Sequence, residues 1–86
     1  MSRYVIEWAA AARKQVEALE TTQARRVARA VGALASDPRP SGCTKLAGGT
    51  NAWRIRVGDW RVVYVVEDAR LLVLVVRVAH RREVYR

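Results

Sequence analysis

This chain of 86 residues has no phenylalanine, and it contains only one cysteine, one histidine and two prolines. The single cysteine, Cys43, excludes an internal disulfide, and with the single histidine, His80, it is too little for a zinc cluster. No apolar run approaches the roughly 20 residues that a membrane-spanning helix needs, and the first residues lack the pattern of a signal peptide. We therefore expect a soluble, cytoplasmic protein with no metal, no other cofactor and no membrane partner.

Acidic residues are also scarce, because 8 Asp and Glu stand against 16 Lys and Arg and give a formal net charge of +8. Such an excess favours a polyanion or an acidic protein as the partner. Only Lys14 and Lys45 are lysines, and the guanidinium group of an arginine can bind a phosphate at two points. A GC-rich genome would also enrich arginine, so the arginine bias leaves both explanations open.

Hydrophobic residues make up 51% of the chain, which is enough for a folded core, and no linker or repeat divides it. Residues 1–86 are therefore predicted to form a single domain. Residues 2–8 alternate as a half-buried strand does, whereas residues 9–20 and 23–35 place their apolar side chains at helical spacing. Thr21 and Thr22 separate the two helical stretches and can cap the second one, so a helical hairpin is expected.

The second half of the chain has the composition of β-structure. Residues 53–57 and 60–66 read as strands joined at Gly58 and Asp59, and a glycine in the first turn position suits a tight type II′ hairpin. Residues 71–78 are nearly all apolar, as in a strand that is covered on both faces. The predicted fold class is α+β: an N-terminal strand, a helical hairpin and a three-strand antiparallel meander, with the helices on one face.

The hairpin predicts which side chains share a face of the sheet. With a two-residue turn, Arg56 lies opposite Arg61 and Arg54 lies opposite Val63. Like charges directly opposite each other destabilise a sheet by up to about 1 kcal/mol, so a fold selected for stability alone would avoid this pair. A phosphate-binding face and an ordinary solvated basic face both fit the pattern. The remaining face is expected to belong to the core, with Trp53, Ile55, Val57, Trp60, Val62 and Tyr64.

The end of the chain carries side chains suited to RNA chemistry. Arginines 81 and 82 can hold phosphate, Tyr85 can stack on an unpaired base, and His80 or Tyr85 can transfer a proton. We expect these groups beside the arginines of the sheet. A frayed basic terminus is the alternative interpretation.

Several segments together resemble the RelE/ParE superfamily of bacterial type II toxins, and the RelE branch in particular. The most specific are residues 53–64, WRIRVGDWRVVY, and residues 80–86, HRREVYR. The segments YVIEW at 4–8, DPRP at 37–40 and KL at 45–46 add to the resemblance. The resemblance implies a RelE-like fold over the whole chain. It also implies an acidic antitoxin protein that forms a heteromeric complex with the chain, and the 70S ribosome with mRNA as the target.

RelE-type toxins cleave mRNA in the ribosomal A site without a metal, which inhibits translation and growth. The reaction implied here is attack of a ribose 2′-hydroxyl on the adjacent phosphate, which leaves a 2′,3′-cyclic phosphate. Relatives use lysine where this chain has arginine on the strand before the hairpin, and arginine is a poor proton acceptor. His80 is therefore the candidate acid or base, and Glu83 is a weaker one. The catalytic residues implied are Arg54, Arg56, Arg61, His80, Arg81 and Tyr85, and the RNA-binding residues are Lys45, Arg54, Arg56, Arg61, Arg82 and Tyr85.

Two other functions stay open from the sequence. A ParE-like toxin has the same fold but inhibits DNA gyrase and cleaves no RNA. A non-catalytic relative would act only with its antitoxin, in autoregulation at an operator. Codon-positioned mRNA ends would indicate the RNase, and double-strand breaks linked to gyrase would indicate the second function.

Overall fold

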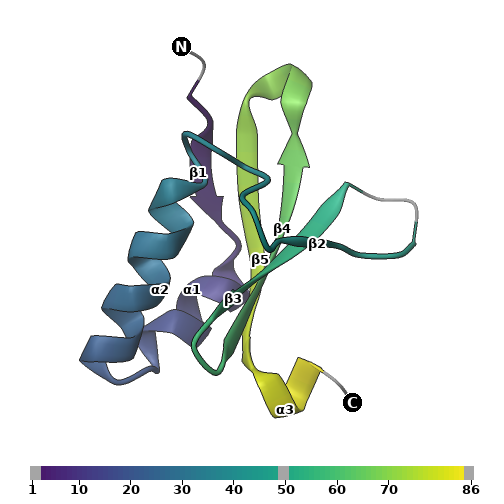
Figure 1. Ribbon diagram of the computed structural model, residues 1–86. Helices are drawn as coiled ribbons and strands as arrows, with labels where there is room; N and C mark the ends of the chain where they lie inside the picture. The colour runs from purple at the N-terminus through teal and green to yellow at the C-terminus, as the bar shows by residue number, and fades with distance from the viewer. Residues whose placement is uncertain (1–2, 49–50, 85–86) are drawn as a thin grey trace.

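The computed structural model describes residues 3–48 and 51–84, and in it a mixed sheet carries two helices on one face (Figure 1). The sheet has five strands in the order β1-β5-β4-β3-β2. Among the described residues no helix is long and apolar enough to cross a membrane. The elements are β1 (Val5–Trp8), α1 (Ala10–Glu17), α2 (Thr21–Ala33), β2 (Thr44–Lys45), β3 (Ala52–Val57), β4 (Trp60–Glu67), a 3₁₀ turn (Asp68–Arg70), β5 (Leu72–His80) and α3 (Arg81–Val84).

The predicted α+β class, helical hairpin and antiparallel meander β3-β4-β5 are all confirmed. The predicted turn at Thr21 and Thr22 is wrong by about two residues, because both threonines lie in the first turn of α2. The extended residue Glu20 precedes the helix, and no side chain caps it. Apolar periodicity determines which face of a helix is buried but leaves its ends uncertain, which explains the error.

Two strands extend the meander. β1 pairs in parallel with β5, from Val5 opposite Leu72 to Trp8 opposite Val75, so β5 lies inside the sheet. The two-residue strand β2 pairs with β3 at the opposite edge. The sequence did not predict β2, because two residues have no measurable period.

The core lies between the sheet and the helical hairpin. Val27 and Val31 of α2 are buried in the same hydrophobic cluster as Val62 and Tyr64 of β4. The hydroxyl of Tyr64 donates a 2.7 Å hydrogen bond to the carbonyl oxygen of Pro38, and burial raises the pKa of this phenol. The loop after α2 is thereby attached to the centre of the sheet.

A β-bulge in β5 decides which of its side chains enter the core. Val63 pairs with Arg77 and the next residue, Tyr64, pairs with Val75, so Val76 is the extra residue on β5. One extra residue reverses the alternation of faces. Val75 and Val78 are therefore both buried, with relative exposures of 0% and 2%, although an uninterrupted strand would point them in opposite directions.

Candidate functional site

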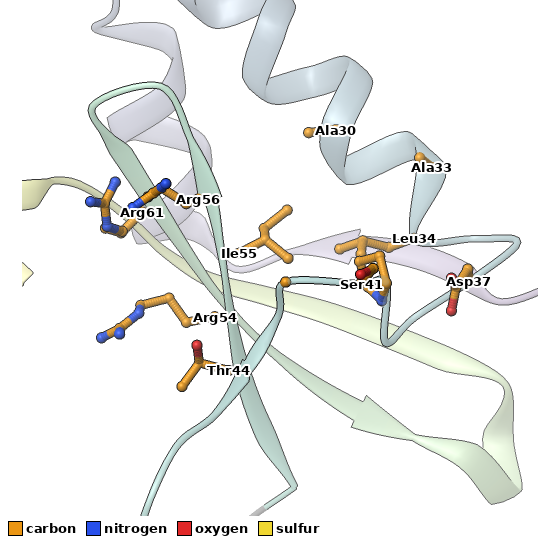
Figure 2. Close-up of a pocket in the computed structure, with 12 residues that line it drawn as sticks. Ala30, Ala33, Leu34, Asp37, Ser41, Thr44, Arg54, Ile55, Arg56 and Arg61 are labelled. Atoms are coloured by element: carbon orange, nitrogen blue, oxygen red, sulfur yellow. The ribbon is translucent and has the colours of Figure 1, made fainter.

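The β3–β4 hairpin has the predicted register. Arg56 pairs with Arg61, and Arg54 pairs with Val63. In Figure 2 the three arginine side chains extend from one side of the hairpin, whereas Ile55 extends from the other side toward α2. The expectation that these arginines share a face opposite the core is confirmed.

The backbone of this hairpin turn favours glycine at position 58. Gly58 has a φ of +61°, which other residues rarely adopt, and this fits the type II′ turn. A Cβ atom at this position would also lie 3.2 Å from the Nη1 atom of Arg26. Because Arg26 belongs to α2, its guanidinium group adds positive charge to the same end of the molecule.

The arginines of this face differ sharply in exposure. Arg61 is only 6% exposed, and its Nη1 atom donates to the carbonyl oxygens of Gly58 and Trp60, both at 3.2 Å. Arg56 is exposed and Arg54 is half-buried. The face is therefore not a uniformly solvated basic surface, because the turn holds one guanidinium group in place.

A groove of about 810 Å³ runs along this edge of the sheet, between β3, the end of α2 and the loop that follows it (Figure 2). One wall is apolar and contains Leu34 and Ile55. Asp37 and Ser41 add polar groups from the loop. The three arginines line the remaining side: Arg54, Arg56 and Arg61. A ligand with both an apolar ring and an anionic group fits such a lining.

His80 does not lie where the sequence analysis expected it. It pairs with Trp60, and paired residues share a face, so its imidazole lies on the helix-covered face rather than beside Arg56 and Arg61. The two rings are nearly perpendicular, at 88°, with their centroids 5.4 Å apart. The indole Nε1 of Trp60 in turn donates a 2.9 Å hydrogen bond to Oε1 of Gln23 on α2.

The short helix α3 is held against the hairpin turn. The N–H of Arg81 donates to the carbonyl oxygen of Asp59 at 2.8 Å, and the Nε of Arg81 lies 3.9 Å from the Oδ1 of Asp59. Arg82 is exposed, and its N–H donates to Nδ1 of His80 at 3.3 Å. Glu83 accepts a hydrogen bond from the N–H of His80, which is a local contact. Tyr85 lies outside the described residues.

Lys45 is separated from the arginines by the pairing of β2. Lys45 lies opposite Trp53 of the core face, and Thr44 is the residue opposite Arg54. The Nζ atom of Lys45 is 5.8 Å from the centroid of Trp53, and the guanidinium carbon of Arg39 is 5.3 Å from it. Lys45 is thus next to an indole ring and not in the arginine cluster.

A second polar cluster lies at the β4–β5 turn. The carboxylate of Asp68 accepts a 2.6 Å hydrogen bond from the hydroxyl of Tyr4, and bonds of 3.1 and 2.7 Å from Arg39. Hydrogen bonding to Arg39 and then to Tyr4 lowers the pKa of Asp68 to about 2. This cluster joins three distant segments of the chain, so it contributes to the fold.

Sequence reasoning missed one cation of the basic face. Arg77 pairs with Val63, which pairs with Arg54, so these three residues form a row across three strands. Arg77 was assigned to an apolar strand, and only the bulge reveals its face. Among the described residues, no three His, Cys, Asp or Glu side chains are grouped so that they could hold a metal ion.

The fold is closely similar to solved structures of toxins. A chain of the toxin–antitoxin complex RelBE2 from Mycobacterium tuberculosis is 25% identical, with a TM-score of 0.81 and 94% of each chain covered. The isolated E. coli RelE toxin is 27% identical, with a TM-score of 0.79, covering 95% of this chain and 90% of that one. The archaeal RelE–RelB complex from Pyrococcus horikoshii OT3 shares the fold, at 24% identity, a TM-score of 0.82 and coverage of 92% and 96%.

The fold and its basic sheet face therefore define a toxin of a type II toxin–antitoxin system, in the RelE/ParE superfamily. Residues 6–85 match the family described as the ParE toxin of type II toxin-antitoxin system, parDE, and the chain belongs to this family. No curated protein matches the sequence significantly. The predicted superfamily is confirmed.

Proposed function

We propose that this toxin is a ribosome-dependent endoribonuclease that cleaves mRNA in the A site. The observation that carries this proposal is the set of arginines on the face of the hairpin opposite α1 and α2, Arg54, Arg56 and Arg61, beside a groove with an apolar wall. A face of this kind can bind the phosphates of a single RNA strand while a base contacts the apolar side.

The proposed reaction needs charge stabilisation more than any other contribution. The 2′-hydroxyl loses its proton and its oxygen attacks the adjacent phosphorus, and the bond to the 5′-oxygen breaks. The leaving oxygen gains a proton, so the products are a 2′,3′-cyclic phosphate and a 5′-hydroxyl. Arg56 and Arg61 stabilise the negative charge that builds on the phosphate, which is the largest contribution a positioned cation makes to catalysis. Arg81 of α3 is assigned to the same phosphate, and Tyr85 to stacking on a base.

The arginine cluster itself is a poor source of a base, because a guanidinium group keeps its proton. His80 contacts Trp60 on the other face, which supports a positioning role for its imidazole. Proton transfer is therefore assigned to solvent or to a ribosomal group that the bound toxin orients. Lys45 and Arg82 are assigned to more distant RNA phosphates, since both are exposed.

The proposed partners are an acidic antitoxin and the 70S ribosome in the cytoplasm. The net charge of +8 favours acidic partners. Two of the similar structures are complexes with an antitoxin, one of them an archaeal RelE–RelB complex. An antitoxin segment over the groove would cover the arginines and prevent RNA binding.

Inhibition of DNA gyrase is the second candidate, because the matching family is described as ParE. Primer extension on translated and untranslated copies of one message, after induction of the toxin, distinguishes the two functions. Cuts that appear only in the translated message, and that Arg61→Gln abolishes, are the expected result. Uncut messages with gyrase-linked double-strand breaks would indicate the second function, and an absence of growth arrest would leave a role with the antitoxin only.

A further inference from the structure

Arg77 is an exposed cation in the most apolar strand of the protein. Among the described residues, none forms a hydrogen bond, ion pair or ring contact with its side chain. Other arginines have a carboxylate partner: the distance is 2.7 Å for Arg39, 3.2 Å for Arg70 and 3.9 Å for Arg81. An arginine without such a partner adds repulsion to a basic face and no compensating contact. Stability of the fold therefore gives no reason for an arginine at this position.

The β-bulge gives Arg77 its direction. If Val76 were an ordinary paired residue, strand alternation would put Arg77 on the same face as the buried Val73 and Val75. With the bulge, the core receives Val78 instead, and Arg77 joins the face of Arg54. One backbone irregularity thus completes the core and also adds a cation to the basic face.

The pairing arranges the basic face in two parallel rows. One row is Arg56 and Arg61, and the other is Arg54 and Arg77 with Val63 between them. The rows are two residues apart, which is about 7 Å along a strand, and Arg54 and Arg77 are two strand spacings apart, which is about 10 Å. Long side chains from both sides of Val63 can therefore converge on one anion above it.

We propose that Arg54 and Arg77 form a second phosphate-binding pair, which holds the RNA phosphate next to the one held by Arg56 and Arg61. The inference rests on the proposed function, because it takes the ligand to be a single RNA strand. The scissile phosphate belongs to the Arg56 row, where a buried guanidinium group is held by the turn. The Arg77 row binds the neighbouring nucleotide and contributes to affinity rather than to the chemical step.

The test compares Arg77→Gln with Arg29→Gln in the full-length toxin. Arg29 is an exposed arginine of α2, so both variants lose one positive charge, but Arg29 lies in the helical layer. Binding of a single-stranded RNA oligonucleotide is measured against salt concentration. The slope of log K against log salt changes by about 0.7 for each phosphate contact with a single strand. We expect the slope to become shallower by about 0.7 for Arg77→Gln. The slope should keep its wild-type value for Arg77→Lys and for Arg29→Gln.

A kinetic measurement separates this inference from the proposed function. In single-turnover cleavage on programmed ribosomes, Arg77→Gln is expected to raise the half-saturating concentration about tenfold, as for a lost charge-assisted hydrogen bond, and to leave the maximal rate within a few-fold. The proposed phosphate-binding pair would be wrong if Arg77→Gln and Arg29→Gln had the same salt slope. It would also be wrong if Arg77→Gln lowered only the maximal cleavage rate. If the wild type cuts no message but the slope still differs between the variants, the RNase proposal fails and the phosphate pair stands. If the glutamine variant unfolds, Arg77→Thr replaces it, because threonine suits a strand.

Discussion

Arg56 and Arg61 face each other one pair away from the hairpin turn, and only Arg61 is held by hydrogen bonds to turn carbonyls. At this non-hydrogen-bonded position the Cα atoms of paired residues are about 4.5 Å apart, so two like charges are close. The turn fixes one guanidinium group, while the other, on an exposed residue, is available to an incoming anion. A phosphate between them would relieve the repulsion.

Arg56→Gln tests this relationship. The variant is expected to be as stable as the wild type or up to about 1 kcal/mol more stable, because the opposing charge is removed. Cleavage on programmed ribosomes should fall about 100-fold, as for the loss of one transition-state donor. Urea unfolding and single-turnover kinetics measure the two effects, with Arg29→Gln as the control. A variant that unfolds early and cleaves normally would make the pair structural.

Arg61→Gln should behave differently, because Arg61 is buried and donates to two carbonyl groups. Removing these donors breaks two charge-assisted hydrogen bonds to carbonyl oxygens of the turn, which costs about 1–3 kcal/mol. We therefore expect lower stability together with the loss of cleavage. The double variant with Arg56→Gln gives the coupling energy between the two side chains. An Arg61→Gln protein with unchanged unfolding would contradict the structural part of this prediction.

His80→Gln tests whether the imidazole positions other groups or transfers a proton. Because it contacts Trp60 and accepts from the N–H of Arg82, we expect looser docking of α3 and a lower urea midpoint. Cleavage should stay within about tenfold of the wild type. A proton-transfer role would instead cost about 100-fold or more at unchanged stability. Gln23→Leu, which removes the acceptor for the indole N–H, should lower stability in the same way.

The carboxylate of Asp68 predicts a pH dependence of stability. Its pKa is lowered from 3.8 to about 2 by Arg39 and Tyr4, so folding favours the ionised form. The stabilisation is complete above pH 4 and is lost as the pH falls toward 2. Denaturant unfolding of Asp68→Asn should show lower stability than the wild type at pH 7 and a smaller difference near pH 2. If the difference in stability stays constant from pH 7 to pH 2, the ionised carboxylate of Asp68 does not stabilise the fold.

The antitoxin should bind in part through the basic face. Because exposed charges are screened by salt, its affinity for the toxin should fall as salt rises. A variant with alanine at four arginines should bind the antitoxin more weakly and with a smaller dependence on salt. The four positions are Arg54, Arg56, Arg61 and Arg81. The control is a variant with alanines at Arg25 and Arg29, two exposed arginines of α2. Equal affinities for the wild type and the fourfold variant would show that the interface is apolar.

The sequence by itself determined the parts of the fold that depend on local chemistry. Gly58 permits the positive φ of a two-residue turn, and this turn sets the whole register from Arg54 opposite Val63 to Val57 opposite Trp60. Strict alternation in β3 then assigned its arginines to one face and its apolar residues to the other. Helical spacing likewise identified the buried side of α2, although its first turn at Thr21 was missed.

Only the tertiary structure decided the features that depend on pairing between distant segments. The bulge at Val76 arises where β4 and β5 meet, and it turns Arg77 to the basic face against the simple alternation of the sequence. The pairing of His80 with Trp60 placed the imidazole against the Trp60 ring, on the face of the sheet opposite Arg56 and Arg61. The burial of Arg61 likewise depends on the folded hairpin around it. Local propensities specify turns and periods, but a change of one residue in register reverses every face beyond it, and only the packed sheet fixes that register.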